Sequence, residues 1–249
     1  MEPDSIPIQT LHVTGLTNRE FLELYSRPGR VGLSGGRTWI DKAICRAERH
    51  LDEQKAWGSW SHAFVFQGQR LDGHHWVIES DLQVHRKHIH LGAQENRISK
   101  YYDEALYTTL AVLDFNLSEA QTTFLLREAL ELVANRARYS LRELLGTLVA
   151  LRRPELRARQ NLLARESSMY CSAFVQHLFR RVGFDLAPGV DMKNTTPEDI
   201  ARTAVPHMTF WLDRAAPQTK EPAQKLHLPR RVRARVRRWR RLHRARPSK

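Results

Sequence analysis

Apolar and polar residues alternate along several short segments in the first half of the chain. This period of two is typical of β-strands that bury one face. The clearest segment is WSHAFVFQ, 60–67, and the turn GQRLDG separates it from a second segment at 74–80. Further candidate strands lie at 29–36, 84–91 and 107–115. The pattern therefore predicts a small antiparallel sheet in this half of the chain.

Helical periodicity dominates the second half. Ser118 opens a capping-box sequence, Ser168 is the expected N-cap of a later helix, and Pro197 follows Thr196 at a first helical position. Strands first and helices afterwards indicate an α+β fold. The expected helices are a short one after Thr17, then 39–47, 118–137, 140–152, 169–181 and a short one from Thr196.

Composition limits the class of protein. The chain has 249 residues, of which 41% are hydrophobic, enough for a sizeable core. Its longest apolar run, 144–151, is far shorter than the roughly 18 residues that a membrane-spanning helix needs. The first ten residues lack the basic and apolar regions of a secretory signal. We therefore expect a cytoplasmic protein without a transmembrane segment, whose two cysteines, Cys45 and Cys171, stay unbridged.

The net charge of +13 is concentrated at the C-terminus. Residues 229–249 hold ten arginines, one lysine and no acidic residue. Without these eleven, 29 of the 40 Lys and Arg remain against 27 Asp and Glu, so the body is nearly neutral. We therefore divide the chain into an N-terminal segment, 1–28, a folded domain, 29–214, and an Arg-rich tail, 215–249.

Apolar residues of the tail recur at steps of three and four, which places them along one side of a helix otherwise covered by arginine. A disordered polycation is the alternative in free solution, because like charges repel and helix nucleation is costly. An amphipathic helix of this kind suits an anionic membrane surface, which we rank ahead of nucleic acid as the partner of 229–249. The apolar residues are Leu228, Val232, Val236, Trp239 and Leu242.

Cys171 is the strongest candidate for a reactive side chain. It would lie in the first turn of the helix capped by Ser168, where unpaired N–H groups and the helix dipole favour a thiolate. The same N–H groups would stabilise an oxyanion after attack on a carbonyl. The structural alternative is that Cys171 is a small core residue, because it belongs to an apolar stripe. The other members of that stripe are Phe174, Val175, Leu178, Phe179 and Val182.

A thiolate nucleophile needs a proton shuttle and a group that orients it. His62 lies in the predicted strand 60–67, and Glu79 lies across a short turn in the next strand, so antiparallel pairing would bring them together. A structural histidine and a solvated carboxylate at a strand end are the alternatives. His74 and His75 compete with His62 for the role of base.

Five histidines cluster in the sequence between positions 74 and 90. His88 and His90 would share one face of a strand, but the spacing matches no standard zinc site. We therefore expect no metal and no other cofactor. Cys45 is expected to be a core residue. The clustered histidines are His74, His75, His85, His88 and His90.

Six pieces of the chain, in order, resemble the permuted papain-like amidases of the YaeF/YiiX type, within the NlpC-like superfamily. The resemblance covers roughly residues 29–206. Two departures are Arg30, where the family often has Asp, and the long basic stretch 152–166. The pieces are Gly29-Arg30-Val31, the stretch 60–66 around His62, Val77-Ile78-Glu79-Ser80, Tyr139, Tyr170-Cys171-Ser172, and Thr196-Pro197-Glu198-Asp199.

The resemblance implies a papain-like, circularly permuted fold, with a small antiparallel sheet packed on the cysteine-bearing helix. It also implies a cysteine hydrolase or acyltransferase that acts on a peptide amide or a lipid ester or amide. Cys171 would be the nucleophile, His62 the base and Glu79 the orienting group. The alternative from a different class is a catalytically idle binding module, recruited to membrane or nucleic acid by its basic tail.

Overall fold

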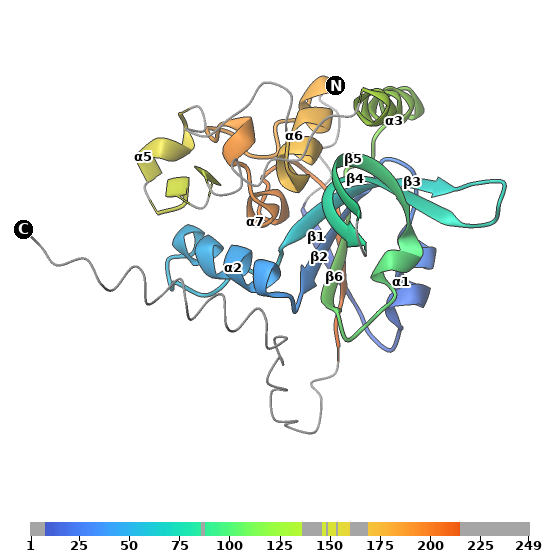
Figure 1. Ribbon diagram of the computed structural model, residues 1–249, viewed down its shortest axis with the longest axis horizontal. Helices are drawn as coiled ribbons and strands as arrows, with labels where there is room; N and C mark the ends of the chain where they lie inside the picture. Colours follow the sequence, from blue (N-terminus) through green and yellow to red (C-terminus); the bar gives the residue numbers. More distant parts are fainter. Residues whose placement is uncertain are drawn as a thin grey trace, which may run out of the picture. The chain divides into compact units, whose positions relative to one another are not determined.

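A computed structural model of the chain describes residues 8–85, 88–135, 146–147, 149–152, 154–159 and 169–214 (Figure 1). The chain divides into two compact units, Met1–Ala215 and Ala216–Lys249. The expected tail, with its candidate amphipathic helix, lies outside the described residues. So do Tyr139 and most of the helix expected over 140–152.

A seven-stranded sheet forms the centre of the first unit, in the order β1-β7-β6-β2-β3-β4-β5. All neighbours pair antiparallel except β1 and β7, which are parallel. The sheet is therefore larger than expected and not purely antiparallel. The strands are β1 (Gln9–Val13), β2 (Val31–Gly36), β3 (His62–Gln69), β4 (His75–His85), β5 (His88–Arg97), β6 (Tyr107–Asp114) and β7 (Met208–Leu212).

The predicted strand at 84–91 needs correction, and two strands of the sheet were missed. The segment 84–91 is not one strand, because β4 continues to His85 and β5 begins at His88 as the second arm of a long hairpin. The strands β1 and β7 were not predicted at all. β1 and the helix that follows it lie in the expected N-terminal segment, 1–28, and both belong to the same compact unit as the rest of the sheet.

Side-chain caps fix the starts of four helices. Thr17, Thr38, Ser118 and Thr196 each close a capping box with the acidic or amide residue three positions later. The helices are α1 (Asn18–Tyr25), α2 (Trp39–Glu48), α3 (Glu119–Ala134), α5 (Pro154–Arg157), α6 (Cys171–Arg181) and α7 (Pro197–Ala201), with 3-10 turns at η1 (Arg49–Leu51), η2 (Ile98–Tyr101) and η3 (Met192–Asn194).

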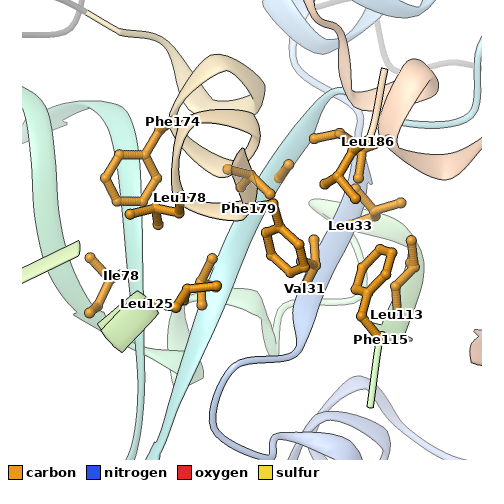
Figure 2. Close-up of a cluster of buried hydrophobic side chains, with 14 of the residues drawn as sticks. Val31, Leu33, Ile78, Leu113, Phe115, Leu125, Phe174, Leu178, Phe179 and Leu186 are labelled. Carbon is orange, nitrogen blue, oxygen red and sulfur yellow. The ribbon is translucent and has the colours of Figure 1, made fainter. Parts of the chain in front are cut away.

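Helices cover both faces of the sheet, which confirms the α+β class (Figure 1). On one face, α3 and α6 pack on alternate residues of the strands, and Phe179 of α6 meets Phe115 at 4.8 Å between ring centroids (Figure 2). On the other face, α1 and η2 cover Phe64 and Phe66 of β3. Among the described residues, no helix has the length and apolar character to cross a membrane.

Candidate active site

His62 and Glu79 come from adjacent strands of the sheet. β3 and β4 pair with Val65 opposite Ile78, so Glu79 lies on the same face as His62 and diagonal to it. Their side chains meet, with 2.5 Å between His62 Nε2 and Glu79 Oε2. Because β4 continues beyond Glu79 to His85, the carboxylate is central in a long strand and fully buried. The alternative of a solvated carboxylate at a strand end is therefore wrong.

Cys171 is the first residue of α6, and its position is set by neighbours on both sides. The N-cap is Tyr170, which makes no side-chain cap, so the expectation that Ser168 caps this helix is wrong. The Tyr170 hydroxyl and the Ser172 hydroxyl both donate to the carbonyl oxygen of Thr195, at 2.5 and 2.8 Å. Ser80 Oγ donates to the Met169 carbonyl at 2.6 Å, which ties the helix start to β4. The thiol is 4% exposed.

The imidazole of His62 lies between Cys171 and Glu79 and interacts with both. Burial by itself would lower the pKa of His62, but the negative charge and hydrogen bond of Cys171, followed by those of Glu79, raise this pKa to about 10. Since Nε2 is bonded to Glu79, Nδ1 is the ring nitrogen that remains for the sulfur. The raised pKa of His62 therefore indicates an imidazolium, which lies between the Cys171 sulfur and the Glu79 carboxylate.

Three further side chains hold the Glu79 carboxylate. Asn96 Nδ2 donates to Oε1 at 2.7 Å, Lys100 Nζ donates to the same oxygen at 2.8 Å, and the Tyr101 hydroxyl donates to Oε2 at 2.5 Å. Lys100 also reaches Asp81, at 2.6 Å. With His62, four donors therefore fix one buried carboxylate in position.

Lys100 supplies the charge that keeps Glu79 ionised. Burial would raise the pKa of Glu79, yet the charge of Lys100 and the contacts with His62 hold it well below its usual value. Burial would lower the pKa of Lys100, and the charges of Glu79 and Asp81 raise it above its usual value instead. Burial beside the same carboxylates raises the pKa of Tyr101, so this hydroxyl stays protonated and acts as a donor.

The sequence interpretation missed Asn96, Lys100 and Tyr101. They come from the end of β5 and from the 3-10 turn η2, where no motif marks them. The one available signal was the alternation of β5, which places Asn96 opposite Val77 and so on the Glu79 face, but it required the correct hairpin register. Lys100 and Tyr101 follow the strand in a turn whose direction the sequence does not specify.

The competing histidines lie elsewhere. His75 Nδ1 contacts Ser26 Oγ at 2.6 Å, and His74 is in the turn between β3 and β4, so neither replaces His62. Within the described side chains, no group of three His, Cys, Asp or Glu is arranged to hold a metal ion. The side chains of His85, His88 and His90 are not among those described.

Arg30 has a structural position rather than one in the site. Its guanidinium is buried and pairs with Asp114 of β6 at 2.5 Å, and it also donates to the Tyr25 carbonyl at 3.1 Å. Arg30 therefore links the end of α1 to β6, and these contacts do not involve Cys171, His62 or Glu79.

Comparison with known proteins adds a distant structural likeness. No protein-family model and no curated protein matches the chain. Among solved structures, the chain is similar to the crystal structure of metalloprotein yiiX from Escherichia coli O157:H7, described as DUF1105. The match has 11% sequence identity and a TM-score of 0.47, and it covers 78% of this chain and 99% of that one. It indicates a distant fold relation and no more.

Proposed function

We propose that the protein is a cysteine hydrolase or acyltransferase of the permuted papain-like kind. The observation that carries this proposal is the continuous buried chain from Cys171 through His62 to Glu79. A thiol beside an imidazole that a carboxylate orients is the arrangement that nucleophilic acyl transfer requires. A core cysteine would need no such partner.

The reaction follows from the positions of these groups. The Cys171 thiolate attacks the substrate carbonyl, and the N–H groups at the start of α6 stabilise the oxyanion, since no side chain of the N-cap occupies them. His62 gives its Nδ1 proton to the leaving amine or alcohol as the carbon–nitrogen or carbon–oxygen bond breaks. Water, or an acceptor amine, then loses a proton to His62 and attacks the thioester, which releases the product and restores the thiolate.

The substrate class is an amide or ester of a peptide or lipid, as the resemblance implies. The order His62, Glu79, Cys171 along the chain is the permuted one, and it agrees with the family whose motifs the sequence carries. The idle binding module is the competing function. Acylation of the Cys171 thiol by a substrate distinguishes the enzyme from the binding module.

The test uses p-nitrophenyl acetate, whose acyl group would remain on the nucleophile. We expect a burst of nitrophenol at neutral pH and an acetyl mass on the peptide that contains Cys171. Cys45 is an internal control, because burial and the charges of Glu48 and Asp41 raise its pKa to about 12. Acetylation of neither cysteine, or of Cys45 in preference to Cys171, would contradict the proposal and favour the binding module.

A matched pair of variants completes this test. Cys45→Ala should keep the burst, because this cysteine donates only a hydrogen bond to the Trp60 carbonyl, at 3.5 Å. Cys171→Ala should abolish it. A burst that survives Cys171→Ala would show that the reaction has another nucleophile.

A further inference from the structure

An open groove of about 710 Å³ lies along the outer side of α2, away from the three candidate active-site residues. Its walls come from α2, the following turn η1, the loop before β3, and residues near 150. None of Cys171, His62 and Glu79 lines it. The lining consists of Trp39, Lys42, Ala43, Arg46, Ala47, Arg49, His50, Trp57, Val149 and Arg152.

The periodicity of α2 divides these residues into two parallel rows. Trp39, Ala43 and Ala47 are four positions apart and form an apolar row, in which two small residues leave room beside the tryptophan. Lys42 and Arg46 follow the same spacing one position earlier and form a cationic row, which Arg49 continues in η1. The apolar row, which we call the floor of the groove, therefore runs beside the cationic row.

The opposite face of α2 fastens the helix to the body of the protein. Ile44 and Glu48 are buried there, and Asp41 Oδ1 accepts a hydrogen bond from Ser61 at 2.8 Å. The Cys45 sulfur donates to the Trp60 carbonyl, two residues before His62. The groove is thus presented by a rigid helix.

In the described part of the chain, no acidic side chain pairs with the cations of the groove. No lining residue is acidic, and within the described part of the chain Lys42, Arg46, Arg49 and Arg152 form no ion pair. The pKa of His50 reflects the positive charge around the groove. This pKa is lowered by partial burial and then by the charges of Arg49, Lys55 and Arg152. A ligand with a negative charge would therefore be favoured here.

The aromatic side chains of the groove face solvent. Trp39 is 76% exposed and Trp57 is 55% exposed, and Val149, which also lines the groove, is 48% exposed. Two exposed tryptophans beside uncompensated cations are the combination found where proteins meet the headgroup layer of an anionic bilayer. The apolar floor would take hydrocarbon, and the cations would take phosphate.

We propose that this groove binds an anionic phospholipid at a bilayer surface. The headgroup phosphate lies against Lys42, Arg46 and Arg49, and the first carbons of the acyl chains lie along Trp39, Ala43 and Trp57. The apolar floor favours lipid over nucleic acid. The phosphates and bases of a nucleic acid would use the cations and the tryptophans, but they would leave the alanines and Val149 uncovered. This site goes beyond the proposed reaction and does not depend on it.

The test is carried out on the full chain with vesicles of phosphatidylcholine, with and without phosphatidylglycerol, and both lipids carry the same photoactivatable acyl chain. We expect crosslinks at residues 39–50 and at Trp57, only when phosphatidylglycerol is present. Crosslinks confined to 229–249 or to other surfaces would overturn the proposal. The position of the crosslinks separates the groove from the Arg-rich tail, which would also attract such vesicles.

Variants sharpen the same experiment. Trp39→Ala with Trp57→Ala, and separately Arg46→Ser with Arg49→Ser, should reduce crosslinking at the groove about tenfold or more. The matched control is Arg19→Ser with Arg127→Ser, which removes two exposed cations elsewhere, 68% and 61% exposed. An equal loss in the control would overturn the proposal. So would variants that leave the vesicle crosslinks unchanged and weaken binding of a single-stranded oligonucleotide.

Failure of this proposal and failure of the proposed function are distinguishable. Lipid crosslinking requires no turnover and should persist in Cys171→Ala. The acetyl-enzyme test requires no bilayer and should persist in the tryptophan and arginine variants. Thermal unfolding of each variant is measured alongside, and because all four substituted groove residues are at the surface, we expect wild-type midpoints.

Discussion

The two cysteines of this protein lie close to the same strand but in opposite chemical surroundings. Cys45 is half-buried on α2 and donates to the carbonyl of Trp60, just before β3 begins. Cys171 is buried at the start of α6 and meets His62, the first residue of β3. Burial and three carboxylates raise the pKa of the Cys45 thiol to about 12, whereas the neighbour of Cys171 is an imidazole.

The comparison teaches that the charge of the group beside a thiol affects the reactivity of that thiol more than its solvent exposure does. The more buried of the two cysteines is the one that we expect to react. At Cys45, negative neighbours oppose the thiolate, whereas the raised pKa of His62 keeps a cation beside the Cys171 sulfur. Each prediction below either removes this contrast or makes it larger.

The largest effect is expected when the nucleophile itself is removed. Cys171→Ala should lower turnover of an activated ester to the uncatalysed rate, while Cys45→Ala should keep the wild-type rate. Steady-state kinetics of the two variants measure the contrast directly. Both should remain folded, since each loses one small sulfur atom. Equal effects of the two substitutions would remove the distinction between the cysteines.

Removal of the imidazole should make the two cysteines alike. His62→Ala should lower the rate by about 10²–10⁴, the usual contribution of a positioned acid or base. It should also slow alkylation of Cys171 by iodoacetamide at pH 6, with little change at Cys45. Mass spectrometry of the two cysteine peptides supplies both rates. If Cys171 keeps its alkylation rate, a group other than His62 activates it.

The contrast should also depend on pH. Because the pKa of His62 is raised from 6.5 to about 10, the imidazolium persists through neutral pH and is lost as the pH passes about 10. Activity should fall on that alkaline side, and alkylation of Cys45 should rise toward about pH 12. The free energy of unfolding should change in the same direction as the activity. The contribution of His62 to it is full below pH 6.5 and disappears as the pH rises through about 10. Urea unfolding at neutral pH and near pH 10 measures it.

A smaller effect is expected at the orienting carboxylate. Glu79→Gln keeps the shape but removes the charge that helps raise the pKa of His62, so the alkaline limb of the rate profile should move to lower pH. The rate itself should fall about tenfold, less than for His62→Ala. Lys100→Met is the companion variant, because it removes the cation that holds Glu79 ionised. An unchanged alkaline limb in Glu79→Gln would show that the carboxylate acts only through packing.

The smallest effect concerns the support of the site rather than its chemistry. A Cβ atom at Gly32 would lie 2.2 Å from the Phe64 ring, which stacks on Tyr101 at 4.3 Å. Gly32→Ala should therefore destabilise the fold by about 1–3 kcal/mol and shift Tyr101 away from Glu79. Denaturant unfolding measures the first effect. A variant as stable as the wild type would indicate that Phe64 has space to move.

The three candidate site residues could be found from the sequence because each is carried by a local pattern. Alternation placed His62 and Glu79 on adjacent strands, and a motif placed Cys171 at a helix start. The predicted start of α6 was wrong. Ser168 is a residue type that often caps helices, but the observed N-cap is Tyr170, which is held by Thr195, far along the chain. A tertiary contact decided this boundary, and local propensity could not reveal it.

The other residues around Glu79 could be placed only with the correct register of the hairpin formed by β4 and β5. The long hairpin of β4 and β5 was interpreted as shorter strands, because the segment from His85 to His90 has no turn residue such as Gly or Pro. With the hairpin misplaced, Asn96, Lys100 and Tyr101 had no predicted position relative to Glu79. The strands β1 and β7 were missed because each is only five residues long and each is stabilised by the other, from opposite ends of the domain.

The pairing of β1 with β7 has a consequence for the order of folding during synthesis. His12 and Asp213, at the ends of these strands, are 201 positions apart along the chain and meet at 2.8 Å. β1 therefore leaves the ribosome well before β7, its only partner in the described sheet. Until then β1 is an exposed strand edge, which other chains can pair with. β1 has only five residues, and this shortness limits that hazard until β7 has formed.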